Sequence, residues 1–199
     1  MRKRLPKILR REQVESLLCA IYPGDGRYRK SEAAAVRNRA AAEVMYRAGL
    51  RVSEVCALAP DTVDLDEGYI FVRRGKGDKD RVVPLDDRAA EWIRRWLAVR
   101  PGDSPYLFCS LSGGRLSDRY VRQVIAQAGE KAGVWLENGE KKKLPHPHTL
   151  RHTLFTEMVE ENFSIAEIGL IAGHSHLATT MVYLHARPRL LAQKIRGRK

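Results

Sequence analysis

The chain has 199 residues, 44% of them hydrophobic and 30% charged, which is enough for one well-buried core. Its 36 lysines and arginines exceed its 24 aspartates and glutamates, and the net charge of +12 favours a polyanionic partner such as nucleic acid or an anionic membrane. No apolar run approaches the roughly 20 residues that span a bilayer, and the basic start is followed by Glu12 and Glu15 rather than by a signal-type apolar core. We therefore expect a soluble, cytoplasmic protein of one domain that is not bound to a membrane.

The first third of the chain predicts three helices. Hydrophobic residues recur at helical spacing at Val14, Leu17, Leu18 and Ile21. This first helix should end near Tyr22, and an Ala-rich second helix should cover 31–48. Gly49 follows where a left-handed C-terminal cap is needed, and Ser53 can cap a short helix over 54–59.

The middle of the chain predicts a hairpin between helices. The β-rich runs 69–74 and 81–85 flank a glycine- and lysine-rich turn, so they predict a hairpin with a basic tip. An amphipathic helix is expected over 87–99, and its inward residues are Trp92, Ile93, Trp96 and Leu97. A short strand is expected over 106–110, and Ser117 should cap a helix that ends near Gly133.

The last third predicts a polar loop and three helices. The loop covers 137–143 and the first helix covers 149–161. Ser164 and Glu167 form a capping box for a helix that ends before Gly173, and a last helix should cover 179–185. Together these elements predict an α+β fold that is mainly α-helical with a small antiparallel β-sheet.

The three cysteines, Cys19, Cys56 and Cys109, are odd in number and widely spaced. They indicate neither a disulfide framework nor a zinc knuckle. We expect them to be small core residues in a reducing cytoplasm.

Reactive side chains gather in the C-terminal part. All six histidines lie between His146 and His185, and the same stretch contains Arg151 and Tyr183. His148 and Arg151 are three residues apart at a helix start, so they share a face and could point together at a phosphate. By itself this pair is a weak signal, because a structural or solvated role is common for such residues.

Five separated motifs occur in one order along the chain: 49–54 (GLRVSE), 75–77 (GKG), 148–152 (HTLRH), 173–175 (GHS) and Tyr183. This combination resembles the tyrosine recombinase family, also called phage integrases, and especially its Xer-like members, from about Leu5 to Ala186. The resemblance implies the DNA breaking-rejoining fold and a family catalytic set at Arg51, Lys76, His148, Arg151, His174 and the nucleophile Tyr183. The acidic residue of the first motif falls on Glu54, as a supporting residue.

These residue types suit the cleavage of a phosphodiester. Two guanidinium groups, on Arg51 and Arg151, can hold the non-bridging oxygens as negative charge develops on them. Tyr183 must lose a proton from a phenol with an ordinary pKa of about 10, and His148 is the preferred acceptor. Lys76 is the candidate acid for the departing 5′ hydroxyl.

The remaining members of the set have assisting roles. His174 would donate a hydrogen bond to the phosphate, and Glu54 would orient Arg51. A covalent 3′-phosphotyrosine would store the bond energy, so that neither a metal nor ATP nor another cofactor is needed. Simpler roles stay open: Tyr183 could pack in the core, Lys76 could be a solvated turn residue, and Lys79 competes with it as the acid.

DNA is the expected partner. Contacts to its backbone are predicted for basic residues of the N-terminal segment and the hairpin, namely Arg2, Lys3, Arg4, Lys7, Lys79 and Arg81. For the N-terminal ones, a solvated tail is the alternative. The resemblance implies a homotetramer on paired DNA sites, and we expect a monomer in the absence of DNA.

The domain assignment follows the motifs. Residues 1–186 are predicted to be the catalytic domain, without the N-terminal core-binding domain that family members usually carry. Residues 187–199 are predicted to be a basic C-terminal tail that docks on a neighbouring protomer through Leu190, Leu191 and Ile195.

Three other functions stay open. A catalytically idle DNA-binding protein would keep the fold and the charge. A metallohydrolase could use His148 and His152, four apart on a helix, with His174 as a third zinc ligand. A type IB topoisomerase would share the covalent step but relax supercoils instead of recombining DNA.

Overall fold

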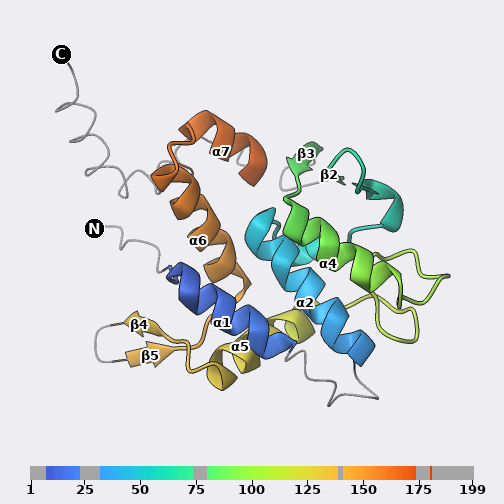
Figure 1. Cartoon of the computed structure of the whole chain (residues 1–199), viewed down its shortest axis with the longest axis horizontal. Helices are drawn as coiled ribbons and strands as arrows, with labels where there is room; N and C mark the ends of the chain where they lie inside the picture. The colour runs from blue at the N-terminus through green and yellow to red at the C-terminus, as the bar shows by residue number, and fades with distance from the viewer. Residues whose placement is uncertain (1–7, 23–31, 74–79, 139–140, 174–179, 181–199) are drawn as a thin grey trace.

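The computed structural model describes residues 8–22, 32–73, 80–138, 141–173 and 180, and Figure 1 shows their arrangement. The helices are α1 (Arg11–Ile21), α2 (Glu32–Arg47), α3 (Val52–Val55), α4 (Asp87–Leu97), α5 (Asp118–Lys131), α6 (Pro147–Glu160) and α7 (Ile165–Ala172), with a 3-10 turn η1 at Pro60–Thr62. The strands are β1 (Val63–Asp64), β2 (Tyr69–Val72), β3 (Arg81–Pro84), β4 (Leu136–Asn138) and β5 (Lys141–Lys143). The expected fold, mainly helical with a small antiparallel sheet, is confirmed.

Helix α2 is the centre of the helical layer and contacts α1, α4, α5 and α6 (Figure 1). Its alanines Ala40, Ala41 and Ala42 are buried, and small side chains allow neighbouring helices to approach closely. The turn after α2 contains Gly49, which has the predicted left-handed conformation with a φ of 62°. A Cβ on Gly49 would lie 2.9 Å from Phe155, so this turn packs directly on α6.

Helix α4 buries its two tryptophans against this centre. Trp92, Ile93 and Trp96 are buried as predicted, and the Trp96 indole nitrogen donates to the Leu107 carbonyl at 2.7 Å. The prediction for Leu97 is wrong, because this side chain is 39% exposed. The apolar face is narrower than the sequence suggested, since the hydrogen bond of Trp96 fixes which side of α4 faces inward.

The sheet confirms the predicted hairpin and adds one strand. β2 and β3 pair antiparallel with Val72 opposite Arg81, and β1 pairs with β2 on the other side. Strand β1 has only two residues, too few to give a periodic pattern. The strand predicted over 106–110 is only an isolated bridge between Cys109 and Arg115, because its backbone is used by side chains such as those of Trp96 and Arg37.

Three local predictions need correction. The segment predicted as a polar loop contains β4 and β5, which pair antiparallel from Leu136 and Lys143 inward; its many charges hid the hairpin. The cap of α3 is Arg51 rather than Ser53, because the Glu54 carboxylate accepts the Arg51 backbone N–H at 2.7 Å. Helix α6 begins at Pro147, two residues earlier than predicted, since proline suits a first helical position.

Other predictions agree with the structure. Ser117 and Ser164 cap α5 and α7, and Gly133 and Gly173 end these helices with positive φ. Cys56 and Cys109 are buried, whereas the prediction that Cys19 is a core residue is wrong, because it lies on the exposed side of α1. The predicted helix over 179–185 lies outside the described residues, apart from buried Thr180.

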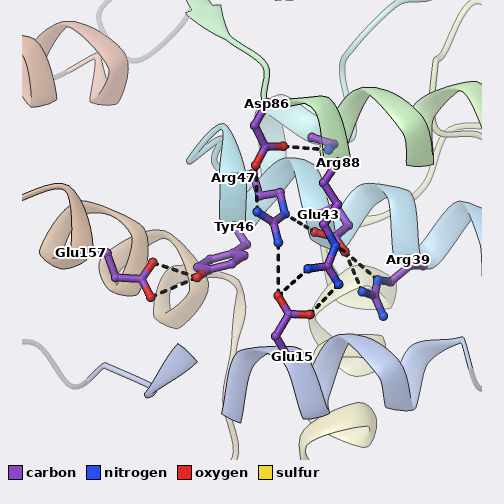
Figure 2. Close-up of polar contacts among 9 residues, drawn as sticks. Glu15, Arg39, Glu43, Tyr46, Arg47, Asp86, Arg88 and Glu157 are labelled. Carbon is purple, nitrogen blue, oxygen red and sulfur yellow. Dashed lines mark hydrogen bonds and ion pairs between the residues drawn. The ribbon is translucent and has the colours of Figure 1, made fainter. Parts of the chain in front are cut away.

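An ionic network centred on buried Glu43 joins α1, α2 and α4 (Figure 2). The fully buried Glu43 carboxylate accepts from Arg39 and Arg47, and Arg47 also pairs with Glu15 and Asp86. Nearby, the Tyr46 hydroxyl donates to Glu157 of α6 at 2.8 Å. These contacts fix the C-terminal half of α2, from which the turn at Gly49 departs.

No helix in the part of the chain that the structure describes is long and apolar enough to cross a membrane.

Candidate active site

The C-terminal end of α7 is the point on which the candidate site is built. A helix of this length leaves its last carbonyl groups without intrahelical partners, and these carry the negative end of the helix dipole. Here the carbonyls of Ile171, Ala172 and Gly173 accept hydrogen bonds from guanidinium groups of three other elements. The helix end is thus a template that gathers positive charge.

Arg51 reaches this template from the turn after α2. Its Nη2 donates to the carbonyls of Ala172 and Gly173, at 3.2 and 3.3 Å, and its Nη1 donates to Glu54 at 2.7 Å. The left-handed Gly49 makes this possible, because it reverses the chain between α2 and α3 and brings Arg51 under α7.

Arg151 reaches the same template from α6. Its Nη2 donates to the Ala172 carbonyl at 2.6 Å, and its Nη1 donates to the Gly49 carbonyl. The residue is buried, and its guanidinium lies over the Phe155 ring at 4.7 Å. Arg51 and Arg151, one hundred residues apart in the sequence, therefore share one carbonyl acceptor, that of Ala172.

Glu54 balances this positive charge. Its two oxygens accept from Arg51 and, in a bidentate pair at 2.9 Å each, from Arg81 of β3. Burial alone would raise the pKa of Glu54, but the hydrogen bonds from Arg81 and the Arg51 backbone and the two positive charges lower it to about 2. The carboxylate is therefore ionised at any working pH.

Histidines line the first turns of α6, next to the arginines. The rings of His146 and His148 lie 6.2 Å apart, and those of His148 and His152 lie 6.3 Å apart. Loss of hydration and then the positive charges of Arg151, Arg122 and Arg51 lower the pKa of His148. Burial and the neighbouring positive groups lower that of His152 to about 4. Both imidazoles are neutral at pH 7 and can accept a proton.

An open hollow of about 470 Å³ adjoins the site. Its lining residues include Arg51, Glu54, Phe71 and Arg73. It leaves part of the Arg51 region reachable from solvent.

The structure brings together Arg51, Glu54, His148 and Arg151 of the predicted site. Lys76, His174 and Tyr183 lie outside the described residues, as do the predicted DNA-contacting residues Arg2, Lys3, Arg4, Lys7 and Lys79. Arg81 is placed against Glu54 and α7, a position that the sequence prediction missed. In the sequence, only the place of Arg81 directly after the glycine-rich turn could have indicated that it lies near the site.

Among the residues whose placement is described, no group of three or more His, Cys, Asp or Glu side chains could hold a metal ion. His174, the third ligand that a zinc site would need, is not among them.

Solved structures first define the class of fold. The chain superposes on the catalytic domain of bacteriophage HP1 integrase with a TM-score of 0.65 and 21% identity, covering 98% of this chain and 95% of that domain, a likeness of fold alone. It superposes on XerA recombinase with a TM-score of 0.79 and 28% identity, covering 100% and 66% of the two chains. It also superposes on a XerH site-specific recombinase bound to palindromic difH substrate, in a post-cleavage complex. The TM-score is 0.77 and the identity is 26%, covering 96% of this chain and 53% of that chain.

The chain belongs to the phage integrase family, which matches residues 7–189. It is 43% identical over 182 residues to the tyrosine recombinase XerA of Thermococcus kodakarensis, covering 90% of this chain and 58% of that protein. It is 38% identical over 200 residues to the tyrosine recombinase XerC of Alcanivorax borkumensis, covering 98% and 61%. The chain thus spans about three-fifths of the length of these relatives.

Proposed function

We propose that this protein is a site-specific DNA recombinase that cleaves and rejoins DNA through a covalent 3′-phosphotyrosine at Tyr183. One observation carries the proposal: the guanidinium groups of Arg51 and Arg151 converge on the end of α7, with the neutral imidazole of His148 one turn from Arg151. The family membership and the relatives named as tyrosine recombinases support it.

In the cleavage step, Tyr183 loses its phenolic proton to His148 and its oxygen attacks the phosphorus. The bond from phosphorus to the 5′ oxygen breaks, and Lys76 gives that oxygen a proton. Arg51 and Arg151 hold the non-bridging oxygens, where negative charge grows. In the rejoining step, the deprotonated Lys76 takes the proton of a 5′ hydroxyl of a second strand, and the oxygen of that hydroxyl attacks the phosphorus. The bond from phosphorus to the Tyr183 oxygen breaks, and protonated His148 returns the proton to that oxygen.

The arrangement of the arginines suits this role. Guanidiniums that are already held by backbone carbonyls need little reorganisation when the phosphate gains charge. The same α7 carbonyls offset the repulsion between two cations that share a site. His174, by the family resemblance, would add a hydrogen bond to the phosphate.

The binding of double-stranded DNA is part of the proposal. The net charge of +12 favours it, and the structurally similar XerH site-specific recombinase is bound to difH substrate in its solved structure. We further propose a homotetramer on paired sites and a monomer without DNA, with the tail 187–199 docking on the next protomer of the ring. A chain truncated after Arg187 that still recombines paired sites normally would refute the docking.

The test uses a pool of nicked duplexes with randomised sequence around the nick. The parent protein should form a DNA adduct that survives denaturation, and Tyr183→Phe should form none while still binding DNA. Sequencing the trapped DNA gives the target, and a plasmid with two copies of it then tests recombination. Absence of any adduct from the parent would contradict the proposal and leave an idle DNA-binding protein.

Two further arms separate the remaining alternatives. EDTA should leave adduct formation unchanged, whereas it would stop the hydrolysis catalysed by a His-ligated metallohydrolase. Relaxation of supercoiled plasmids that lack the selected site would indicate a type IB topoisomerase. For Lys76, a substrate with sulfur in place of the bridging 5′ oxygen has a leaving group that needs no acid, so Lys76→Ala should cleave it nearly as fast as the parent does.

A further inference from the structure

Arg81 joins three elements of the candidate site. Its Nε donates to the Ile171 carbonyl of α7 at 3.0 Å, and its Nη1 and Nη2 donate to the two oxygens of Glu54 at 2.9 Å each. The side chains of Arg81 and Glu54 are only 9% and 8% exposed. Every nitrogen of this guanidinium is thus hydrogen-bonded within the protein.

Glu54 passes this constraint to Arg51. Its Oε1 accepts from the side chains of both arginines, and its Oε2 accepts from Arg81 and from the Arg51 backbone N–H. A bidentate pair between a planar guanidinium and a carboxylate fixes the orientation of both groups. The carboxylate that faces Arg51 therefore cannot rotate while Arg81 is in place.

Packing at Gly173 supports the same arrangement. This residue ends α7 with a φ of 59°, and a Cβ there would lie 3.0 Å from Cδ, Nε and Nη1 of Arg81. The close approach of Arg81 to the end of α7 thus requires the absence of a side chain at this position.

The position of Arg81 in the sheet links its contacts with Glu54 and α7 to the turn that contains Lys76. Arg81 begins β3 and pairs with Val72 at the turn end of the hairpin, so it is the first described strand residue after the turn that contains Lys76. β3 and α7 are in contact. Five residues span at most roughly 18 Å of extended chain, so an anchor at Arg81 limits where Lys76 can lie.

We propose that Arg81 is a positioning residue, which ties the β2–β3 hairpin to Glu54 and the end of α7 and thereby orients Arg51, rather than a contact to the DNA backbone. The inference rests on the proposed recombinase function for its effect on the reaction. Its structural part, the pair with Glu54, can be tested without any reaction.

The kinetic test compares Arg81→Ala and Arg81→Lys with Arg73→Ala. Arg73 is the matched control because it lies at the same hairpin, pairs with Asp61 in solvent at 57% and 65% exposure, and carries the same charge. Arg81→Lys keeps the charge and the alkyl stem but not the bidentate fork. Adduct formation on the selected nicked duplex should fall by roughly 10- to 100-fold in both Arg81 variants, since a misplacement of about 1 Å has effects of that size. In Arg73→Ala it should stay within about threefold of the parent.

Two readouts separate positioning from a merely structural role or a phosphate contact. Combining Arg81→Ala with Glu54→Gln should slow the reaction no more than the worse single variant does, because both act through one pair. For DNA binding, the slope of log K against log salt measured with Arg81→Ala should match the slope measured with Arg73→Ala. A slope smaller in magnitude by about 0.9 than that of this control would mean that Arg81 contacts a phosphate, and it would overturn the proposal. So would an Arg81→Lys variant that is as fast as the parent.

A carboxyl ¹³C titration tests the pair itself. The pKa of Glu54 should rise from about 2 toward its ordinary value in Arg81→Ala and stay low in Arg73→Ala. An unchanged pKa of Glu54 in Arg81→Ala would refute the positioning role even if the reaction slowed. Should the parent form no adduct at all, the proposed function fails, while a raised pKa of Glu54 would still support the pairing.

Discussion

Replacing Glu43 with Gln should destabilise the protein more than any surface change, because Glu43 is the fully buried centre of the network in Figure 2. Its Oε1 accepts from Arg39 at 2.7 Å and its Oε2 accepts from Arg47 at 2.7 Å. Arg47 keeps Glu15 and Asp86 as partners, but Arg39 is only 3% exposed and pairs with no other carboxylate among the described residues.

The magnitude follows from that asymmetry. Removing one partner of a buried ion pair leaves an uncompensated charge and costs roughly 3–5 kcal/mol. In a chain of this length a loss of 1 kcal/mol lowers Tm by about 2–4 °C, so the variant should melt roughly 6–20 °C below the parent. The stacking of Arg39 on the Trp92 ring, at 5.0 Å, should soften the loss toward the lower figure.

Urea unfolding followed by circular dichroism measures the free energy of unfolding. The matched control is Glu91→Gln on α4, whose pair with Arg95 is exposed at 54% and 53% and should contribute at most about 1 kcal/mol. The double variant Arg39→Leu/Glu43→Leu should recover much of the loss, because no isolated charge remains. A Glu43→Gln variant no less stable than Glu91→Gln would refute the reasoning.

Three further predictions concern the site. Gly49→Ala should lower the unfolding free energy by roughly 2–5 kcal/mol, because a positive φ costs about 1–2 kcal/mol and the clash with Phe155 about 1–3 kcal/mol. Gly133→Ala, with a similar φ and open space around it, should show only the cost of the positive φ. Equal losses in the two variants would refute the clash. The pKa of Glu54 is lowered in the folded state, so its stabilising effect is present above pH 4.5 and lost as the pH falls. Between pH 5 and pH 3, the free energy of unfolding of the parent, measured with urea, should fall by on the order of 2 kcal/mol more than that of Glu54→Gln. The pKa of His148 is lowered from its ordinary value of 6.5, so the rate of adduct formation should rise with pH through a value below 6.5 and level off above it. This rise with pH should vanish in His148→Ala and persist in His146→Ala. Its persistence in both variants would exclude His148 as the base.

The predicted elements with strong local signals agree with the structure. Helix caps at Ser117 and Ser164, the left-handed Gly49 and the end of α7 before Gly173 were predictable, because each depends on the conformational range or hydrogen bonding of one residue. Charged or very short strands were not, since β4, β5 and β1 owe their pairing to neighbours rather than to their own residues.

For the candidate site, the sequence by itself determined which residue types are present and in which order. The resemblance of the ordered motifs to the tyrosine recombinase family implied that Arg51, Glu54, His148 and Arg151 belong to one site, and their chemistry suits a phosphate. Only the tertiary structure decided that the carbonyls at the end of α7 gather the two arginines and that Arg81 binds Glu54. Those contacts join residues up to 122 positions apart, and backbone carbonyls carry no residue-specific signal, so no local pattern could have predicted them.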